Sequence, residues 1–133
     1  MSSKRKVLDS LQNLRKATDK LQAALDIPVD RELVMEGTTQ RYEVTVELVW
    51  KTLKRSLQYE GINSKTPRET MKKGFEVGWL NDEIVWQDLL DGRNTTSHEY
   101  LDEEFIENNY ADIKKVFPYI KELVEFLENR YTE

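Results

Sequence analysis

Apolar residues recur every three or four positions along almost the whole chain, and charged or polar residues fill the positions between them. Residues 8 to 25 show this pattern most clearly. Their stripe consists of Leu8, Leu11, Leu14, Thr18, Leu21 and Leu25. The spacing predicts an amphipathic helix with one buried face. Pro28 disfavours helical geometry at Ile27, so we expect this helix to end near that residue.

A second, longer helical pattern covers residues 31 to 60, with Asp30 as its predicted N-cap and Gly61 as its predicted stop. Gly37 is a candidate point of interruption. The first apolar stripe of this segment is Tyr42, Thr45, Val46, Val49, Leu53 and Leu57, and the second is Val44 and Leu48 with Trp50 beside them. A helix with two apolar faces usually lies at the centre of a bundle and packs on neighbours on both sides.

A third helix is predicted to start at Thr66, with Thr66 as the N-cap, Pro67 as the first helical residue and Glu69 completing a capping box. This helix should be short and end at Gly74 or Gly78.

Asn81 is the predicted cap of a fourth helix, and Asp102 of the last one. In the fourth helix the residues predicted to share a face are Ile84, Val85, Asp88, Leu89 and Gly92. In the last helix the stripe is Phe105, Ile106, Tyr110, Ile113, Val116, Phe117, Ile120, Leu123, Val124 and Leu127. Pro118 lies within it and predicts a kink.

The chain shows no sustained strand alternation, hairpin signal or internal repeat. These patterns predict an all-α, up-and-down bundle of four or five helices that forms a single domain over residues 1–133. Three tryptophans, Trp50, Trp79 and Trp86, are predicted to lie in the core or at an interface, with the core favoured.

Composition narrows the function. The chain has 133 residues and a formal net charge of −5, which argues against broad nonspecific binding to nucleic acid. Short basic runs, residues 4–6, 51–55 and 72–73, could line a local groove, but solvated helix faces are the favoured interpretation. The absence of cysteine excludes disulfides and thiolate chemistry, and a single histidine makes a zinc site improbable, so we expect no metal or cofactor. Without a membrane span or a signal peptide, we expect a cytoplasmic protein.

Most catalytic patterns are missing. The five glycines are isolated, so no phosphate-binding loop occurs. Ser97 adjoins His98, but neighbouring side chains on a helix point about 100° apart, which makes them a poor catalytic pair. Glu43 and Glu47 lie four residues apart with Lys51 four further on, an arrangement more typical of a helix surface than of a catalytic pair.

The stretch DGRNTTSHEY, residues 91–100, holds the strongest candidate chemistry because it contains the single histidine. Histidine can move a proton near neutral pH, and arginine offers a planar donor group for a phosphate. His98 and Arg93 therefore suit RNA cleavage without a metal. His98 would withdraw a proton from a ribose 2′-hydroxyl or protonate the leaving oxygen, and Arg93 would stabilise the charged phosphate. The alternative is an ordinary helix terminus with His98 near the C-terminal dipole.

The spacing of Arg93 and His98 limits how they can act together. Residues five apart on an ideal helix lie about 140° apart around its axis. They would converge if the helix loosens or ends between them, which Gly92 and the polar run at residues 94–97 would permit, or if they meet across a dimer. A symmetric dimer would also supply two histidines, one to act as acid and one as base.

Three stretches of the sequence resemble the HEPN superfamily, in particular its branch of nucleotidyltransferase substrate-binding proteins, which are encoded beside minimal nucleotidyltransferases. The stretches are GTTQRYEVTVELVWKTLKRSLQYEGI at residues 37–62, TPRETMKKGFEVGWL at residues 66–80 and WQDLLDGRNTTSHEY at residues 86–100. Within the third, RNTTSHEY fits the Arg-x4-His-x-Tyr motif of HEPN toxins.

The resemblance implies a helical bundle that forms a homodimer, with the motifs of two chains in one cleft. It implies a metal-independent endoribonuclease toxin in which Arg93 and His98 are catalytic and Asn94 helps to set the phosphate or the histidine. Tyr100 would accept AMP from the cognate minimal nucleotidyltransferase, the antitoxin, and the added charge and bulk would keep the RNA substrate out. The branch name also leaves open a non-catalytic subunit that presents a substrate to the nucleotidyltransferase.

Overall fold

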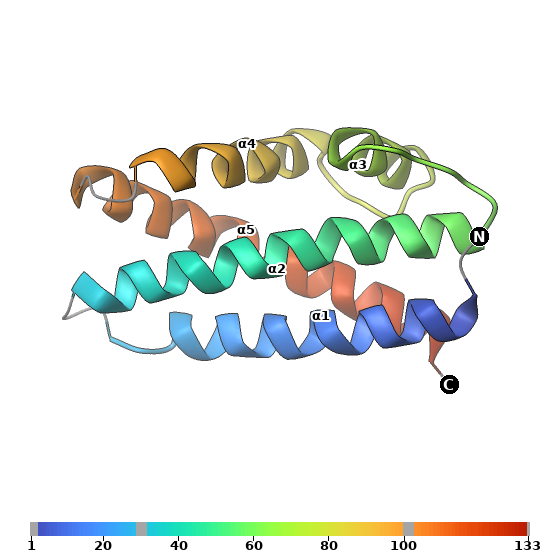
Figure 1. Ribbon diagram of the computed structural model, residues 1–133, viewed down its shortest axis with the longest axis horizontal. Coiled ribbons are helices and arrows are strands. Elements are labelled where there is room, and N and C mark those ends of the chain that lie inside the picture. The colour runs from blue at the N-terminus through green and yellow to red at the C-terminus, as the bar shows by residue number, and fades with distance from the viewer. Residues whose placement is uncertain (1–2, 29–31, 100–102, 133) are drawn as a thin grey trace.

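The computed structural model describes residues 3–28, 32–99 and 103–132, and of these the side chains of all but residues 32, 92–99 and 103–106. All the regular structure in these ranges is helical. The helices are α1 (Lys4–Leu25), α2 (Glu32–Tyr59), α3 (Pro67–Glu76), α4 (Glu83–Glu99) and α5 (Glu103–Tyr131). Figure 1 shows α1 and α2 side by side, with α3 and α4 end to end along the opposite side of α2 and α5 behind. The predicted all-α bundle is confirmed.

Helix α2 is continuous through Gly37, so the interruption considered there is absent. A glycine inside a helix costs about 1 kcal/mol relative to alanine, and the packing of this long helix against α1 and α5 offsets that cost. The predicted stop is confirmed, because α2 ends at Tyr59 and Gly61 has a φ of 88°, a left-handed conformation that favours glycine. The predicted cap Asp30 lies outside the described residues.

Helix α3 begins as the sequence predicts. The backbone N–H of Glu69 donates to the hydroxyl oxygen of Thr66 over 3.1 Å, and Pro67 occupies the first turn. The helix ends at Glu76, and Gly78 then turns the chain with a φ of 80°. Gly74 is buried where α3 meets α2, and a Cβ atom there would approach Leu80 to 3.0 Å and Leu53 to 3.1 Å. The close contact between the two helices therefore depends on a residue without a side chain.

Asn81 is not the cap of α4, and this prediction is wrong by one residue. The backbone N–H of Val85 donates to the carboxylate of Asp82 over 3.4 Å, and Asp82 has a φ of 59°, a region that aspartate tolerates better than most residues. Asn81 instead donates its amide to Glu122 of α5 over 2.9 Å. Both residues are good capping types, so sequence alone did not distinguish them.

Helix α5 continues through Pro118, and its predicted cap Asp102 lies outside the described residues. Pro118 is exposed, so the backbone hydrogen bond that proline removes is missing on the side that faces water.

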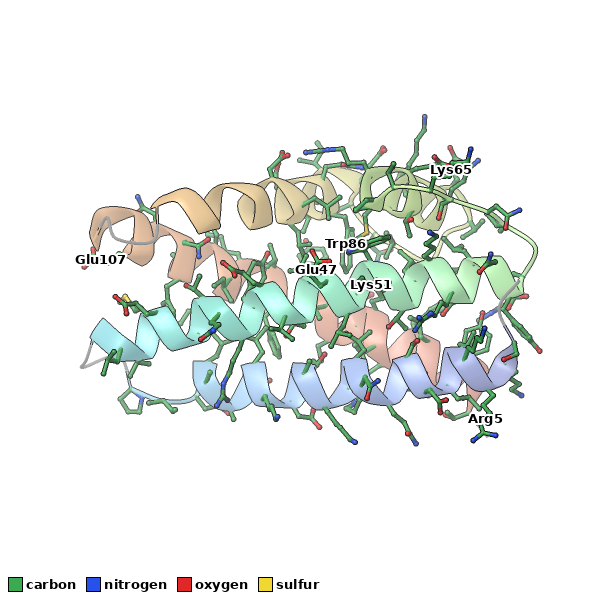
Figure 2. The ribbon with its side chains drawn as sticks, viewed as in Figure 1. Arg5, Glu47, Lys51, Lys65, Trp86 and Glu107 are labelled. Carbon is green, nitrogen blue, oxygen red and sulfur yellow. The ribbon has the colours of Figure 1, made fainter. Side chains whose placement is uncertain are left out.

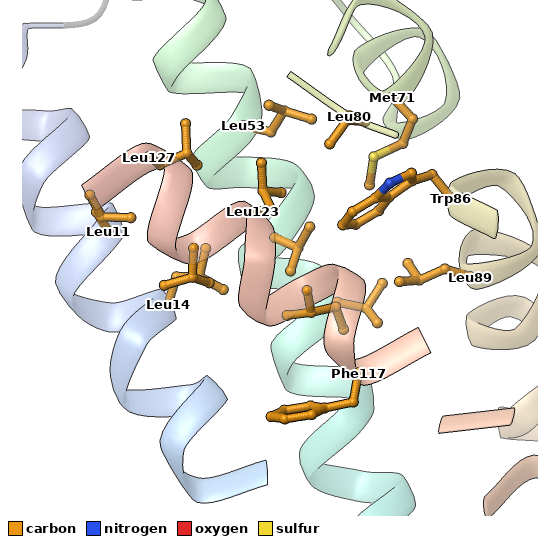
Figure 3. Packing of buried hydrophobic residues seen from close by; sticks show 14 of the residues in the cluster. Leu11, Leu14, Leu53, Met71, Leu80, Trp86, Leu89, Phe117, Leu123 and Leu127 are labelled. Carbon is orange, nitrogen blue, oxygen red and sulfur yellow. The ribbon is translucent and has the colours of Figure 1, made fainter. Parts of the chain in front are cut away.

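The core forms where α1, α2 and α5 meet and extends to α3 and α4 (Figure 3). Its largest fully buried side chains include Trp86, Leu14, Leu21, Leu53, Leu57, Met71, Leu89, Ile113, Ile120 and Leu127. The first predicted stripe of α2 is buried as expected, whereas Val44 of the second stripe is 54% exposed. Of the tryptophans, Trp86 lies in the core, and Trp50 and Trp79 are partly buried against it.

Candidate functional site

The last turns of α4 carry the predicted catalytic residues. Arg93, Asn94 and His98 all lie within this helix, but their side chains are outside the description. Tyr100, the predicted modification site, lies outside the described residues. In Figure 1 the C-terminal end of α4 lies at the same end of the bundle as the start of α2 and the start of α5. The motif is therefore at one end of the bundle.

The buried face of α4 overlaps only in part with the set of residues predicted to share a face. Trp86, Leu89 and Leu90 are each at most 2% exposed, whereas Ile84 is 73% exposed and Asp88 is exposed. Figures 2 and 3 show Trp86 pointing from α4 into the interior. The predicted face is therefore only partly the buried one: Leu89 lies in the core, whereas Ile84 and Asp88 face the solvent, because Trp86 and Leu90 lie on the side that packs.

The helical register now places the motif relative to the core. The backbone at position 93 lies two turns beyond Trp86, on the side of α4 that carries the core residues. The backbone at position 98 lies two turns beyond Asp91, on the exposed side. Because α4 continues to Glu99, the helix does not end between Arg93 and His98.

Helix α4 is tied to α3 just before the motif. The guanidinium of Arg68 on α3 donates to Gln87 over 2.9 Å and forms an ion pair with Asp91. Gln87 and Asp91 are four residues apart, so one arginine spans a full turn of α4. This exposed contact links α3 to α4 immediately before position 93.

A groove of about 580 Å³ lies between α2, α4 and α5, and Asp91, two residues before Arg93 in the sequence, is among its lining residues. It is lined by Tyr42, Val85, Asp88, Leu89, Asp91, Asn109, Asp112, Ile113, Lys115, Val116 and Tyr119. Leucine, isoleucine and valine side chains form its floor, and the charged residues lie at its exposed rim. The sequence assigned Tyr42 to the core and gave no role to Asp112, because the meeting of α2 with α5 is not visible in the spacing of either helix.

The groove is acidic, with Asp88, Asp91 and Asp112 against Lys115. Tyr42 is only 3% exposed. Burial raises the pKa of the Tyr42 phenol well above its usual value, and the negative charge of Asp112 raises that pKa further. The phenol therefore remains protonated and can act as a hydrogen-bond donor.

The other predicted candidates behave as surface residues. Glu47 accepts a hydrogen bond from the indole of Trp50 over 3.0 Å, and Lys51 is exposed (Figure 2). Partial burial raises the pKa of Glu43, but Glu43 does not line the acidic groove. These observations agree with positions on a helix surface, rather than in a catalytic pair, for Glu43, Glu47 and Lys51.

The described residues hold no group of three or more histidine, cysteine, aspartate or glutamate side chains that could bind a metal ion. Within the same ranges, none of the helices has the length and apolar character needed to cross a membrane.

An all-α bundle with the Arg-x4-His motif near the end of its fourth helix corresponds to the predicted class, and comparison with known proteins confirms it. The chain belongs to the family described as nucleotidyltransferase substrate binding protein like, whose model matches residues 9–129.

A curated relative from Haemophilus influenzae, named probable ribonuclease HepT, is 30% identical over 105 residues, which cover 75% of this chain and 71% of the relative. A crystal structure of a Thermus thermophilus protein matches 90% of this chain and 99% of its own with a TM-score of 0.74 and 24% identity. A second structure, from Haemophilus influenzae and described as revealing the fold of a substrate binding domain of a nucleotidyltransferase, matches 95% and 99% of the two chains with a TM-score of 0.68 and 24% identity. The likeness to the two structures concerns the fold alone.

Proposed function

We propose that this chain is the toxin of a toxin–antitoxin pair and cleaves RNA without a metal ion through Arg93 and His98. The observation that carries the proposal is the 30% identical relative named a probable ribonuclease. An intact Arg-x4-His-x-Tyr motif in this sequence supports it, because these residue types can move a proton and stabilise a phosphate.

In the proposed reaction one His98 removes the proton from a ribose 2′-hydroxyl, and the 2′-oxygen attacks the adjacent phosphorus. The bond from phosphorus to the 5′-oxygen breaks, and that oxygen takes a proton from the His98 of a second chain. Arg93 neutralises charge on the five-coordinate phosphate, and Asn94 positions the phosphate or the imidazole. The single histidine of each chain supports a cleft built from two chains of a homodimer, because one histidine cannot act as acid and base at once.

We propose that Tyr100 is the regulatory residue. The cognate minimal nucleotidyltransferase would transfer AMP from ATP to it: the phenol oxygen attacks the α-phosphorus, and pyrophosphate leaves. The new phosphate beside Arg93 and His98 would repel RNA and block access to the imidazole. The family description, which names a nucleotidyltransferase, supports such a partner.

The ribonuclease activity is tested by expressing the chain without its partner. We expect wild-type protein to arrest growth and to cleave RNA in the presence of EDTA, and His98→Ala or Arg93→Ala to relieve both effects by a factor of at least about 100. Harmless wild-type protein that leaves RNA intact would exclude the toxin.

A second candidate function is a non-catalytic subunit that presents a substrate to a nucleotidyltransferase. The family description favours it. The modification of Tyr100 is tested independently of these two functions, by mass spectrometry after incubation with the nucleotidyltransferase and Mg-ATP. We expect the wild-type mass to rise in AMP units and the Tyr100→Phe mass to stay constant. An unchanged wild-type mass removes the regulatory role of Tyr100 whichever function holds.

A further inference from the structure

A second groove, between α1 and α2, is basic although the chain as a whole is acidic. It has a volume of about 760 Å³. Of the described residues that line it, three are cations, namely Lys16, Lys20 and Arg41, and none is a carboxylate. The whole chain, in contrast, carries a formal net charge of −5. The three cations lie outside the short basic runs of the sequence, because two different helices bring them together.

The cations of this basic groove are exposed and keep their charge available. Among the described residues, Lys16, Lys20 and Arg41 take part in none of the ion pairs. The guanidinium of Arg41 donates to the backbone carbonyl oxygen of Lys20 over 2.8 Å, which leaves its other N–H groups for a ligand. A guanidinium held in place by a neutral acceptor keeps its full charge and loses less conformational freedom when an anion binds.

The spacing of the cations suits a chain of anions better than a single one. Lys16 and Lys20 are four residues apart, which is about 6 Å along one side of α1, and Arg41 reaches Lys20 from the neighbouring helix. Arg55 lies about four turns further along the same side of α2. Arg55 also bridges the two helices, by donating to the hydroxyl of Ser10 on α1. Positive charge therefore continues along the line where α1 meets α2.

The floor of the basic groove is uncharged. Ala17 and Leu48 are half-buried there, Val44 is 54% exposed, and Asn13 and Gln40 add amide groups. Val44 and Leu48 belong to the second apolar stripe predicted for α2, and both line this groove. An apolar floor between cations can contact sugars and bases while the cations bind phosphates.

The basic groove lies at the end of the bundle that carries the motif. Lys20 is in the last two turns of α1, and Arg41 is in the first three turns of α2. In Figure 1 this end of α2 lies at the same end of the bundle as the C-terminal end of α4. Helix α2 separates the groove from α4, and a helix with its side chains is about 10–12 Å wide. An extended polymer can cross that width, whereas a small ligand in the groove cannot.

We propose that the basic groove binds the sugar–phosphate backbone of a single RNA strand on its way to the motif. Lys16, Lys20 and Arg41 pair with phosphates of the strand, and Val44 and Leu48 contact its sugars or bases. A groove between two packed helices, whose axes typically lie about 8–10 Å apart, suits one strand rather than a duplex. The choice of RNA as the polyanion rests on the proposed function. Contacts with phosphates carry no sequence information, so the groove holds the strand without selecting the cleavage site.

The test is the binding of the full chain to a fluorescent, single-stranded oligoribonucleotide in which every 2′-hydroxyl is methylated, so that the proposed cleavage cannot occur. Fluorescence anisotropy gives the Kd at several salt concentrations. We expect the double variant Lys16→Gln, Lys20→Gln to raise Kd at least about tenfold at low salt. The slope of log K against log salt should become shallower by about 1.4, because two phosphate contacts are lost at about 0.7 each. Both lysines are exposed, so the variant should fold.

A matched control removes the same charge outside the groove. Lys72 on α3 and Lys121 on α5 are exposed and do not line the basic groove. The double variant Lys72→Gln, Lys121→Gln should bind the oligoribonucleotide with the wild-type slope, because charges far from the strand are screened by salt.

Equal losses in the groove variant and the control variant would mean that only total charge matters, and they would overturn the inference. Failure of the wild type to bind the oligoribonucleotide at low salt would also overturn it. The other possible occupant is an acidic protein surface. If the groove variant binds the oligoribonucleotide normally but no longer binds the nucleotidyltransferase or a second copy of the chain, the groove is a protein interface and the inference fails.

Failure of this inference and failure of the proposed ribonuclease give different results. A chain that binds the methylated strand as expected but leaves ordinary RNA intact keeps the inference and removes the ribonuclease. A chain that cleaves ordinary RNA but binds the methylated strand equally well with and without Lys16 and Lys20 keeps the ribonuclease and removes the inference.

Discussion

Glu60 is the residue at which the end of α2 is tied to the end of α5. Its carboxylate accepts hydrogen bonds from Arg130 over 3.1 Å and from Tyr131 over 2.8 Å, and Arg130 also lies 5.0 Å from the ring centre of Trp79. One surface carboxylate therefore connects the C-terminal ends of two long helices, and Arg130 adds a contact with the segment after α3.

The hydrogen bonds from Arg130 and then Tyr131 lower the pKa of Glu60 below its ordinary value of 4.5. A lowered pKa in the folded state means that the ionised carboxylate stabilises the fold above about pH 4.5, and that this stabilisation is lost as the pH falls through the folded pKa. We expect Glu60→Gln to lower the free energy of unfolding by about 0.5 kcal/mol at pH 7, because the ion pair is largely exposed. Urea titrations should show the difference shrinking below about pH 4; a constant difference would contradict the assignment.

Leu53 and Leu33 lie on the same helix, α2, but one is buried and the other is exposed, so the same substitution can be compared at both. Leu53 is fully buried, and Leu33 is 75% exposed. Leu53→Ala should lower the free energy of unfolding by about 2–5 kcal/mol through lost burial and a cavity, whereas Leu33→Ala should change it by less than about 0.5 kcal/mol. Chemical denaturation of both variants checks this, and similar losses would mean that the face of α2 is wrongly assigned.

The buried face of α2 could be predicted from the sequence, whereas the acidic groove could not. The stripe from Tyr42 to Leu57 predicted the buried face of α2, because helical periodicity reports burial directly. The acidic groove was not predictable, since it depends on Asn109 and Asp112 of α5 lying beside Tyr42. Distances between helices are set by packing across the whole bundle and leave no mark in the spacing of one segment.

At the scale of elements, local signals predicted starts and stops well where one residue type was decisive. Thr66 with Pro67 and the turn at Gly61 are such cases. The prediction was less accurate where two neighbours could serve equally, as with Asn81 and Asp82. The residues predicted to share a face of α4 also correspond only in part to its buried side, since Leu89 is buried and Ile84 is exposed.

Two helical glycines should respond oppositely to alanine. At Gly37 an added Cβ meets nothing within 4 Å, so Gly37→Ala should stabilise the protein by about 0.5–1 kcal/mol through helix propensity. At Gly74 the Cβ would press on the packed side chains of Leu80 and Leu53, so Gly74→Ala should destabilise it by about 1 kcal/mol or more. Thermal unfolding of the two variants measures both effects. A higher Tm for Gly74→Ala would contradict the prediction and would show that α3 can move away from α2.

At the scale of the whole molecule, the packing of α2, α3 and α5 against α4 decides which side of α4 faces the core. The contacts of Trp86 with the core and of Arg68 with Gln87 and Asp91 determine which sides of α4 carry positions 93 and 98. Acid–base cleavage of RNA needs one group that takes a proton and another that gives one, and each chain has a single histidine. We therefore propose that the ribonuclease acts as a pair of chains, each supplying a histidine to one cleft.

Mixing wild-type and His98→Ala chains tests this claim most directly. The two are unfolded together and refolded at constant total concentration in EDTA, so that they pair at random, and RNA cleavage is measured against the wild-type fraction. If each cleft needs both histidines, activity follows the square of that fraction, and an equal mixture retains about one quarter of the wild-type rate. A linear decline, with about half of the rate in the equal mixture, would show that one histidine is enough for each cleft and would contradict the two-histidine mechanism.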